Sequence, residues 1–189
     1  MATARTARPV KLFVGLLGSD PDLLRRARQH LVRRFGPTDH ESPQWPFTHT
    51  DYYADEMGPD LLRWFLSFER LVRPHALAEI KTDTNQMEQE IAEEALAVMP
   101  RPVNLDPGYL DLGKVVLATT KDRSHRIYLG LGIYAEVTLH YADGAWRAWP
   151  WTYPDYQSDE YRGFFAEVRT RYREQRQAEA DGPAREDHA

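Results

Sequence analysis

Charged side chains that could bind a phosphate ester gather between Asn104 and Tyr141. Lysine and arginine neutralise phosphate oxygens, and a nearby carboxylate can hold Mg²⁺ or a proton, so this mixture suits such chemistry. An exposed charged turn is the alternative interpretation, because functional sites are a minority of charged clusters. The candidate residues are Asp106, Lys114, Lys121, Arg123, His125, Arg126 and Glu136.

Glu136 is the candidate that is hardest to explain as a surface charge. Residue types alternate from 134 to 140, which predicts a strand with Glu136 and His140 on one face. Leu139 is then expected on the opposite face. A carboxylate on a buried face needs a cation or a donor, and His140 or Arg126 could supply one.

Three polar residues of a predicted helix form a second group. Lys81, Asn85 and Glu88 recur at helical spacing, so they share a stripe beside the apolar face. They could hold a polar ligand between the helix and the sheet. A solvated Lys81–Glu88 pair flanking an ordinary core stripe is the alternative.

A third group, between Thr48 and Gly58, could bind a cation. Its carboxylates could act together with Glu136 or Asp106, and its histidine could act as an acid or base. For the histidine, a packing role is the commoner interpretation. The residues are His49, Asp51, Asp55 and Glu56.

Three classes of site lack their motifs. No Gly-x-x-x-x-Gly-Lys-Ser/Thr run is present, so a P-loop nucleotide site is not expected. Phosphoesterases with two His-x-Ser/Thr motifs are excluded because this chain has only His40-Glu41-Ser42. The histidines have no zinc-ligand spacing.

Composition narrows the remaining functions. The 189 residues are 42% hydrophobic, which suits one domain, and the net charge of −5 argues against general nucleic-acid binding. The absence of cysteine excludes disulfides and thiol chemistry and suits a cytoplasmic protein. No apolar run is long enough for a membrane span, so we expect no membrane association.

The elements that would position these residues follow one another in a regular order. Strands are predicted at 11–17, 43–53 and 62–72, with helices at 21–35 and 74–98. Asp20 and Pro21 predict the first helix start, as N-cap and first helical residue. The Gly15-to-Ser19 stretch is expected to be an ordinary strand-to-helix turn.

A meander follows the second helix. Asp106-Pro107-Gly108 predicts a turn leading into antiparallel strands at 114–120, 127–140 and 145–149. Gly130 and Gly132 indicate a bulge or a close approach of another backbone within the second of these strands, and Asp143-Gly144 indicates a hairpin turn after it. An aromatic segment, 149–156, and a helix at 159–175 complete the pattern.

This order predicts an α+β protein. Its core would be a ferredoxin-like split βαβ arrangement, with an antiparallel sheet covered by helices on one side, extra antiparallel strands and a C-terminal helix. We expect a disordered leader at 1–9, a single domain at 10–176 and a disordered tail at 177–189.

Several segments together resemble an uncharacterised bacterial family of unknown function, whose members are often described as GTP-binding. The guanine motif Asn-Lys-x-Asp is missing here, so that description gains no support from this chain. The resemblance implies that some of its polar residues form one site; these residues are Asn85, Glu88, Asn104, Asp106, Lys121, His125 and Arg126. The segments are 47–58, 81–88, 104–109, 125–129 and 151–156.

Two functions follow from these observations. The first is binding of a phosphorylated small molecule or nucleotide, with or without Mg²⁺-dependent catalysis, and it requires the charged side chains to converge on one concave surface. The second is a non-catalytic protein-binding or assembly module, which predicts that they scatter. Under the first, the catalytic candidates are Glu136, His125 and Asp106, and the ligand-binding candidates are Lys81, Asn85, Glu88, Asn104, Lys114, Lys121 and Arg126.

Overall fold

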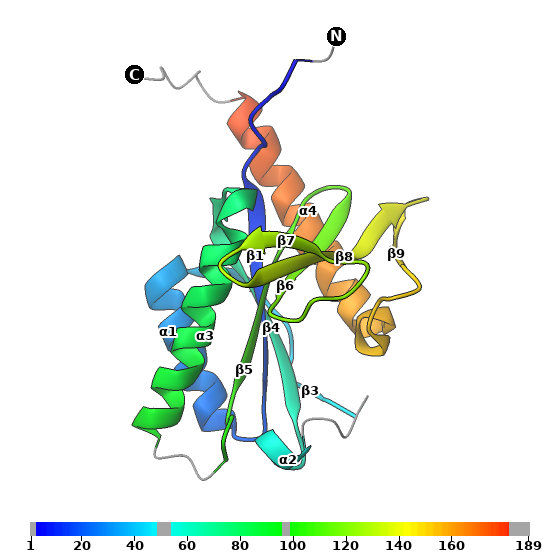
Figure 1. Ribbon diagram of the computed structural model, residues 1–189. Coiled ribbons are helices and arrows are strands. Elements are labelled where there is room, and N and C mark those ends of the chain that lie inside the picture. The colour runs from blue at the N-terminus through cyan, green and yellow to red at the C-terminus, as the bar shows by residue number, and fades with distance from the viewer. Residues whose placement is uncertain (1–2, 49–53, 96–98, 182–189) are drawn as a thin grey trace.

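The computed structural model describes residues 3–48, 54–95 and 99–181, and within them nine strands pair antiparallel in one sheet (Figure 1). Along the sheet these are β2 (Thr38–Glu41), β4 (Leu62–Val72), β1 (Val10–Gly18), β5 (Asn104–Leu110), β6 (Lys114–Thr119), β8 (Ile133–Ala142) and β7 (Ile127–Gly130). In addition, β3 (Trp45–Pro46) pairs with β4, and β9 (Ala145–Ala148) pairs with β8. The mixed α+β class is as predicted.

Helices cover both faces of the sheet, whereas the sequence predicted one covered face. Helices α1 (Pro21–Phe35) and α3 (Leu77–Glu94) lie side by side on one face, and α4 (Asp159–Asp181) crosses the other (Figure 1). The short helices are η1 (Pro74–Ala76), α2 (Ala54–Met57) and η2 (Pro154–Gln157). The error arose because helix periodicity shows that a helix has a buried side but not which face of the sheet it covers.

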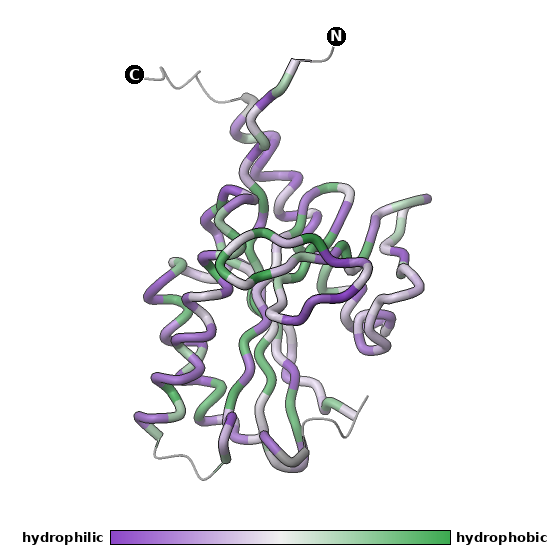
Figure 2. Tube along the Cα trace, viewed as in Figure 1, coloured by the Kyte–Doolittle hydropathy of each residue, from purple (hydrophilic) through white to green (hydrophobic). Residues whose placement is uncertain are grey.

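The central strand β1 is buried along its whole length. Its side chains alternate between two cores: Leu12, Val14 and Leu16 pack with α1 and α3, while Phe13 packs with α4. The Phe13 and Phe165 rings meet edge-on, with centroids 4.9 Å apart. Burial on both faces explains why residues 12–17 of this strand form an uninterrupted run without polar side chains, whereas the helices α1 and α3 alternate between hydrophilic and hydrophobic residues (Figure 2).

Local signals at both ends of α1 are confirmed. The Asp20 side chain accepts a hydrogen bond from the backbone N of Asp22 at 2.7 Å, and Pro21 is the first helical residue. The helix ends before Gly36, whose φ of 93° suits glycine. Gly15 and Gly18, predicted in a turn, instead lie within β1.

Three strand predictions were wrong in detail. Asp106-Pro107-Gly108, predicted as a turn, lies inside β5, where Gly108 faces Phe13 of β1 and Leu117 of β6. In place of a strand at 43–53, β2 and β3 flank Pro43, and residues 49–53 lie outside the described part of the chain. The strand predicted at 127–140 is a hairpin of β7 and β8.

The β7–β8 hairpin forms because the backbone adopts turn conformations between the two strands. Gly130, Leu131 and Gly132 all have positive φ, which reverses the chain where a bulge was predicted. The Asp143-Gly144 turn between β8 and β9 is confirmed, and both of its residues have positive φ.

A bulge in β8 changes which side chains share a face. Val115 of β6 pairs with Leu139, but the next residue, Val116, pairs with Val137. The extra residue, Thr138, breaks the alternation, so Leu139 and Glu136 lie on the same face of the sheet. The sequence had placed them on opposite faces.

The helical ends also differ from prediction. Helix α3 is preceded by the separate turn η1 and ends at Glu94; residues 96–98 of the predicted helix lie outside the described part. Helix α4 extends to Asp181, past the predicted start of the tail at 177. Its predicted buried side is confirmed by Tyr161, Phe164, Phe165, Val168 and Tyr172.

Candidate functional site

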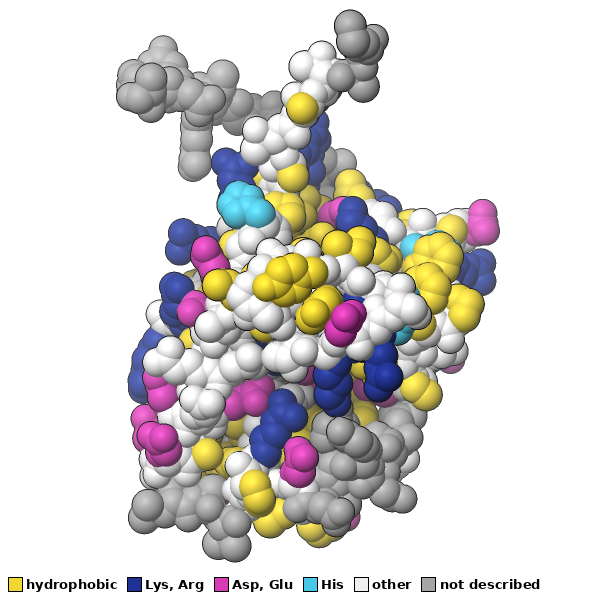
Figure 3. Space-filling model, in the orientation of Figure 1, with side chains coloured by type: hydrophobic (Ala, Val, Ile, Leu, Met, Phe, Trp, Pro, Cys, Tyr) yellow, Lys and Arg dark blue, Asp and Glu magenta, His cyan; other side chains and the backbone are white. Residues whose placement is uncertain are grey.

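A cleft opens where β5 and β6 separate. The two strands pair only between Gly108–Leu110 and Val115–Leu117, so the first half of β5 has no β6 partner. The loop from Thr120 to Arg126, which we call the β6–β7 loop, stands opposite that unpaired edge. The cleft has a volume of about 650 Å³, and Lys and Arg side chains gather in the middle of this face (Figure 3).

Most of the predicted site residues converge on this cleft. Glu88 lies directly behind the lining and contacts two lining residues, whereas Asn85 is half-buried elsewhere on α3. Lys114 lies in a separate hollow of about 460 Å³, with its Nζ 2.5 Å from Asp111 Oδ2. The predicted residues that line the cleft are Lys81, Asn104, Asp106, Lys121, Arg123, His125, Arg126 and Glu136.

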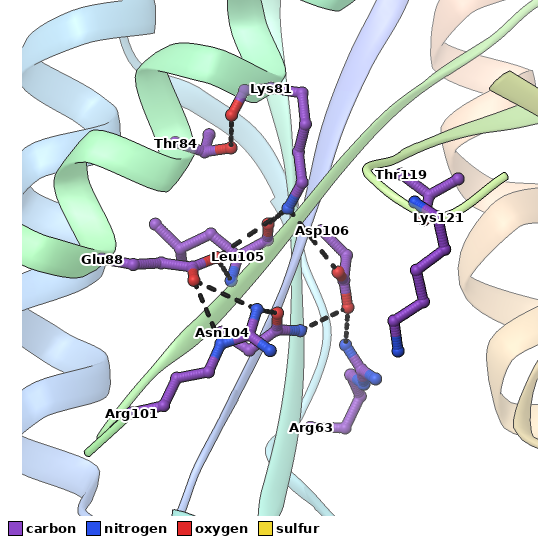
Figure 4. Close-up of polar contacts among 10 residues, drawn as sticks. All are labelled: Arg63, Lys81, Thr84, Glu88, Arg101, Asn104, Leu105, Asp106, Thr119 and Lys121. Atoms are coloured by element: carbon purple, nitrogen blue, oxygen red, sulfur yellow. Dashed lines mark hydrogen bonds and ion pairs between the residues drawn. The ribbon is translucent and has the colours of Figure 1, made fainter. Parts of the chain in front are cut away.

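Two side chains of helix α3 form hydrogen bonds with the backbone of Leu105, at the edge of β5 that has no β6 partner. The Nζ of Lys81 donates to the carbonyl O of Leu105 at 2.6 Å, and the backbone N of Leu105 donates to Glu88 Oε1 at 2.7 Å (Figure 4). Buried backbone groups must be paired, and no β6 strand is available here. Lys81 and Glu88 therefore hold the edge of β5 and keep the cleft open.

Glu88 is a buried carboxylate between two cations. Its Oε2 lies 3.1 Å from Arg101 NH2, and its Oε1 lies 3.8 Å from Lys81 Nζ. Burial raises the pKa of Glu88 above its ordinary value, and the two cations only partly oppose this effect. Arg101 also donates to the Asn104 side chain.

Asp106 points into the cleft and is surrounded by donors. Its Oδ2 accepts from Arg63 NH1 at 3.1 Å and from Asn104 Nδ2 at 2.7 Å. Lys81 Nζ lies 4.0 Å from Oδ1. Burial alone would raise the pKa of Asp106, but the charges of Arg63 and Lys81 outweigh burial and lower it, so the group is a carboxylate.

Arg63 reaches Asp106 across an intervening strand. Arg63 belongs to β4 and Asp106 to β5, with β1 between them, and Gly15 of β1 pairs with Asp106. A Cβ on Gly15 would lie 3.2 Å from Arg63 NH1 and 2.9 Å from Phe65 Cε1. Because Gly15 has no side chain, the Arg63 guanidinium has room to pass over β1 and reach Asp106.

Replacing Gly15 with alanine should therefore lower the free energy of unfolding by about 1–3 kcal/mol, since the added methyl crowds a packed ring and displaces Arg63. Urea unfolding measures the change. Gly163→Ala is the matched control, because its Cβ on α4 meets nothing within 4 Å, and it should stabilise by about 0.5–1 kcal/mol. Equal effects at both positions would contradict the role of Gly15.

Glu136 anchors the β6–β7 loop. Its Oε2 accepts from Arg126 Nε at 2.7 Å and lies 3.1 Å from His125 Nε2, and the carboxylate side chain is only 1% exposed. The other nitrogens of Arg126 donate to the carbonyl O of Lys121 and to the hydroxyl of Tyr153. The predicted partner Arg126 is thus correct, whereas His140 instead lies against the Trp149 ring.

Aromatic rings form one wall of the cleft. His125 stacks on Trp151 with centroids 5.4 Å apart, and Trp151 stacks in turn on Trp149 at 5.3 Å. Trp151 and Tyr153 line the cleft while remaining 38% and 44% exposed. This wall offers apolar surface beside the charged side chains.

A protein-held metal does not fit the described residues. They contain no group of three or more His, Asp or Glu side chains placed to hold an ion. The cleft carboxylates Asp106 and Glu136 already contact cations. Of the third predicted group, His49 and Asp51 and the side chain of Asp55 lie outside the described residues, and Glu56 is exposed.

Sequence reasoning missed several cleft residues. Arg63, like Glu136, is a charged residue inside a largely apolar strand, so the same reasoning could have identified it. Arg101 lies in an irregular segment and Asp155 in the short helix η2, and neither stretch of sequence predicts an orientation. Trp151 and Tyr153 had been assigned to the aromatic segment rather than to a site. All five line the cleft: Arg63, Arg101, Trp151, Tyr153 and Asp155.

Comparisons with known proteins place the chain in a family without assigning an activity. No helix in the described residues is long and apolar enough to cross a membrane. No curated protein matches the chain. A family model described as a domain of unknown function (DUF4416) matches residues 8–172, nearly the whole described fold, and the chain belongs to that family.

Proposed function

We propose that the cleft binds a small phosphate-bearing molecule. The observation that carries this proposal is the charge of the cleft: six Lys or Arg residues and three carboxylates line it, in a chain whose net charge is −5. If the carboxylate of Glu88, which lies behind the lining, is included, the four carboxylates are still fewer than the six cations. A site that concentrates positive charge in a concave, partly buried surface favours an anionic ligand.

The β6–β7 loop contributes three of the six cations that line the cleft, Lys121, Arg123 and Arg126. Lys121 and Arg123 are exposed on it, and in Figure 4 the Lys121 side chain extends into the gap opposite Asp106. Arg126 has all three guanidinium nitrogens engaged within the protein. We assign phosphate contact to Lys121 and Arg123, because both are exposed and line the cleft, and assign Arg126 to positioning the loop.

Roles for the three catalytic candidates follow from their exposure. Glu136 is 1% exposed and contacts Arg126 and His125, so it suits a positioning role. Asp106 is 29% exposed in the cleft and can contact ligand. His125 is the candidate acid, oriented by Glu136 as a carboxylate orients an imidazole.

His125→Gln should weaken phosphate binding, because the substitution removes the imidazole from the cleft lining. Thermal shift with inorganic phosphate measures the change, and unchanged binding would contradict a contact between His125 and the ligand.

We also propose that the half of the sheet beside the cleft is the ferredoxin-like split βαβ core. In its support, the strand order β2-β4-β1-β5, all antiparallel, combines with α1 after β1 and α3 after β4 on one face. β6 to β9 would then be the addition that brings the β6–β7 loop over the core. An experimental structure with a different order of these four strands would exclude this relationship.

Lys121→Ala should remove most of the ligand-dependent gain in melting temperature. A ligand at about 100 times its dissociation constant stabilises by roughly 2.7 kcal/mol, which in a protein of this size is a shift of about 5–10 °C. The panel comprises inorganic phosphate, methyl phosphate, sugar phosphates and nucleotides, each tested by thermal shift.

Arg26→Ala is the control for general charge loss, because Arg26 is exposed on α1 outside the cleft. We expect it to keep the full shift, whereas Arg123→Ala should lose part of it. Loss of the shift in Arg26→Ala to the same extent as in Lys121→Ala would mean that general charge, and not the cleft, binds the anion.

A protein-binding role is the second candidate, favoured by one observation. The edge hairpin exposes Ile127, Tyr128 and Leu131 to 71%, 59% and 66%. Exposed apolar edge strands are surfaces on which other chains can pair. Concentration-dependent mass in sedimentation, abolished by Ile127→Lys, would favour this role; a monomer at all concentrations without any partner captured would count against it.

A further inference from the structure

We infer that the ligand of the cleft is a phosphorylated polyol, whose hydroxyl groups bind Asp106 while its phosphate binds the β6–β7 loop. This inference rests on the proposed phosphate site and adds what the other end of the ligand must be. Its basis is that the two sides of the cleft differ in charge and in hydrogen-bonding capacity.

The inner side of the cleft is electrically balanced. Arg63 lies 3.1 Å from Asp106 and 3.7 Å from Asp155. Glu88 lies 3.1 Å from Arg101 and 3.8 Å from Lys81, so three cations match three carboxylates. A second anionic group placed here would meet the carboxylate of Asp106 instead of an excess of cations. The ligand therefore carries its negative charge at the loop end and is uncharged at the inner end.

Asp106 offers that uncharged end an acceptor. Both of the hydrogen bonds that it accepts from described residues, Arg63 and Asn104, reach Oδ2. Within the described residues Oδ1 accepts no hydrogen bond, and Lys81 Nζ at 4.0 Å is too far to donate one. With 29% of the side chain exposed in the cleft, Oδ1 can accept from a ligand O–H or N–H.

The aromatic wall suits the remaining surface of such a ligand. Trp151 and Tyr153 line the cleft beside the loop cations, and the C–H face of a sugar packs against aromatic rings while its hydroxyls point to polar groups. A sugar phosphate and a nucleoside monophosphate share this chemistry of a phosphate joined to a diol. The experiment below separates the two.

The test is calorimetric titration of the full chain with methyl phosphate and ribose 5-phosphate. Both are phosphate monoesters, so the comparison measures what the sugar adds, in hydroxyl groups and in C–H surface. We expect ribose 5-phosphate to bind at least about tenfold more tightly, because a hydrogen bond to a charged group contributes that much or more. An adenosine monophosphate arm identifies the source: tighter binding than ribose 5-phosphate indicates a nucleotide, weaker binding a free sugar phosphate.

Asp106→Asn should abolish this advantage. Arg63 and Asn104 both donate to Oδ2, so the new amide places its oxygen there and turns its NH₂ group toward the cleft. The acceptor for hydroxyls is lost, so this variant should bind ribose 5-phosphate no more tightly than methyl phosphate. If this variant does not fold, 2-deoxyribose 5-phosphate and methyl phosphate with the wild-type protein still measure the contribution of the hydroxyls.

The outcomes separate this inference from the phosphate site itself. Equal binding of methyl phosphate and ribose 5-phosphate, both dependent on Lys121, would overturn the inference and leave the phosphate site intact. Binding of neither compound would overturn both. A preference for ribose 5-phosphate that persists in Asp106→Asn would also overturn the assignment of Asp106.

Discussion

Replacing Glu136 with alanine should lower the free energy of unfolding by about 3–5 kcal/mol. The substitution leaves the Arg126 guanidinium, 4% exposed, without its carboxylate, and removing one partner of a buried ion pair costs this much. Because Arg126 also holds the carbonyl of Lys121 and the hydroxyl of Tyr153, the β6–β7 loop should lose its position. Phosphate binding should weaken with it.

A double-mutant cycle measures this coupling. Urea unfolding of Glu136→Ala, Arg126→Ala and the double variant should give a double-mutant cost well below the sum of the single costs. Glu90→Ala is the control, since Glu90 lies on α3 outside the cleft lining. Additive costs would contradict the assignment of Glu136 as the anchor of the loop.

Arg63→Ala should destabilise by a similar amount, about 3–5 kcal/mol. Arg63 is 3% exposed and lies beside two carboxylates, Asp106 at 3.1 Å and Asp155 at 3.7 Å, which would keep their charge without this cation. Arg63→Lys should recover only part of the loss, because one ammonium group cannot reach both carboxylates across β1. Full recovery would show that position 63 needs only a positive charge.

The cost of Arg63→Ala should depend on pH in a defined direction. In the fold the pKa of Asp106 is lowered: burial would raise it, but Arg63 and Lys81 more than offset burial. A lowered pKa contributes stability that is present above the unfolded pKa of about 3.9 and is lost as pH falls through the folded pKa.

The difference in unfolding free energy between wild type and Arg63→Ala should therefore be constant near neutral pH and shrink below about pH 4. Urea unfolding from pH 2 to 7 measures this difference. A difference that does not change with pH would contradict the ion pair between Arg63 and Asp106.

The predictable parts of the fold were those controlled by neighbouring residues. Asp20, Pro21 and Gly36 define the first helix by their own backbone and capping chemistry, and the structure confirms them. Asp143-Gly144 likewise makes its turn from local backbone preference. Such signals act over a few residues, so one sequence contains all the information they need.

The parts that were mispredicted depend on segments far apart in the chain. Asp106-Pro107-Gly108 has the composition of a turn, yet pairing with β1 and β6 holds it as a strand. The bulge at Thr138 is specified by its β6 partner and is invisible in the alternation of β8 alone. Tertiary context of this kind overrides local propensity.

The candidate site was predictable as a set of residue types but not as a geometry. Glu136 could be identified because an apolar strand makes an isolated carboxylate conspicuous, and Arg126 because such a carboxylate needs a cation. The joint contact of Lys81 and Glu88 with Leu105 could not be predicted, since it depends on the separation of β5 from β6. The position of Lys114 in a separate hollow could not be predicted either, because it also depends on how β5 and β6 pair.

The most direct measurement of the central claim is a titration of the ¹⁵N-labelled protein with methyl phosphate, followed by amide chemical shifts. If the cleft binds phosphate, the largest changes should map to the β6–β7 loop and to Asn104–Asp106 of β5, and should be absent from Lys121→Ala. Changes centred on the separate hollow at Lys114, or no changes at millimolar ligand, would contradict the account.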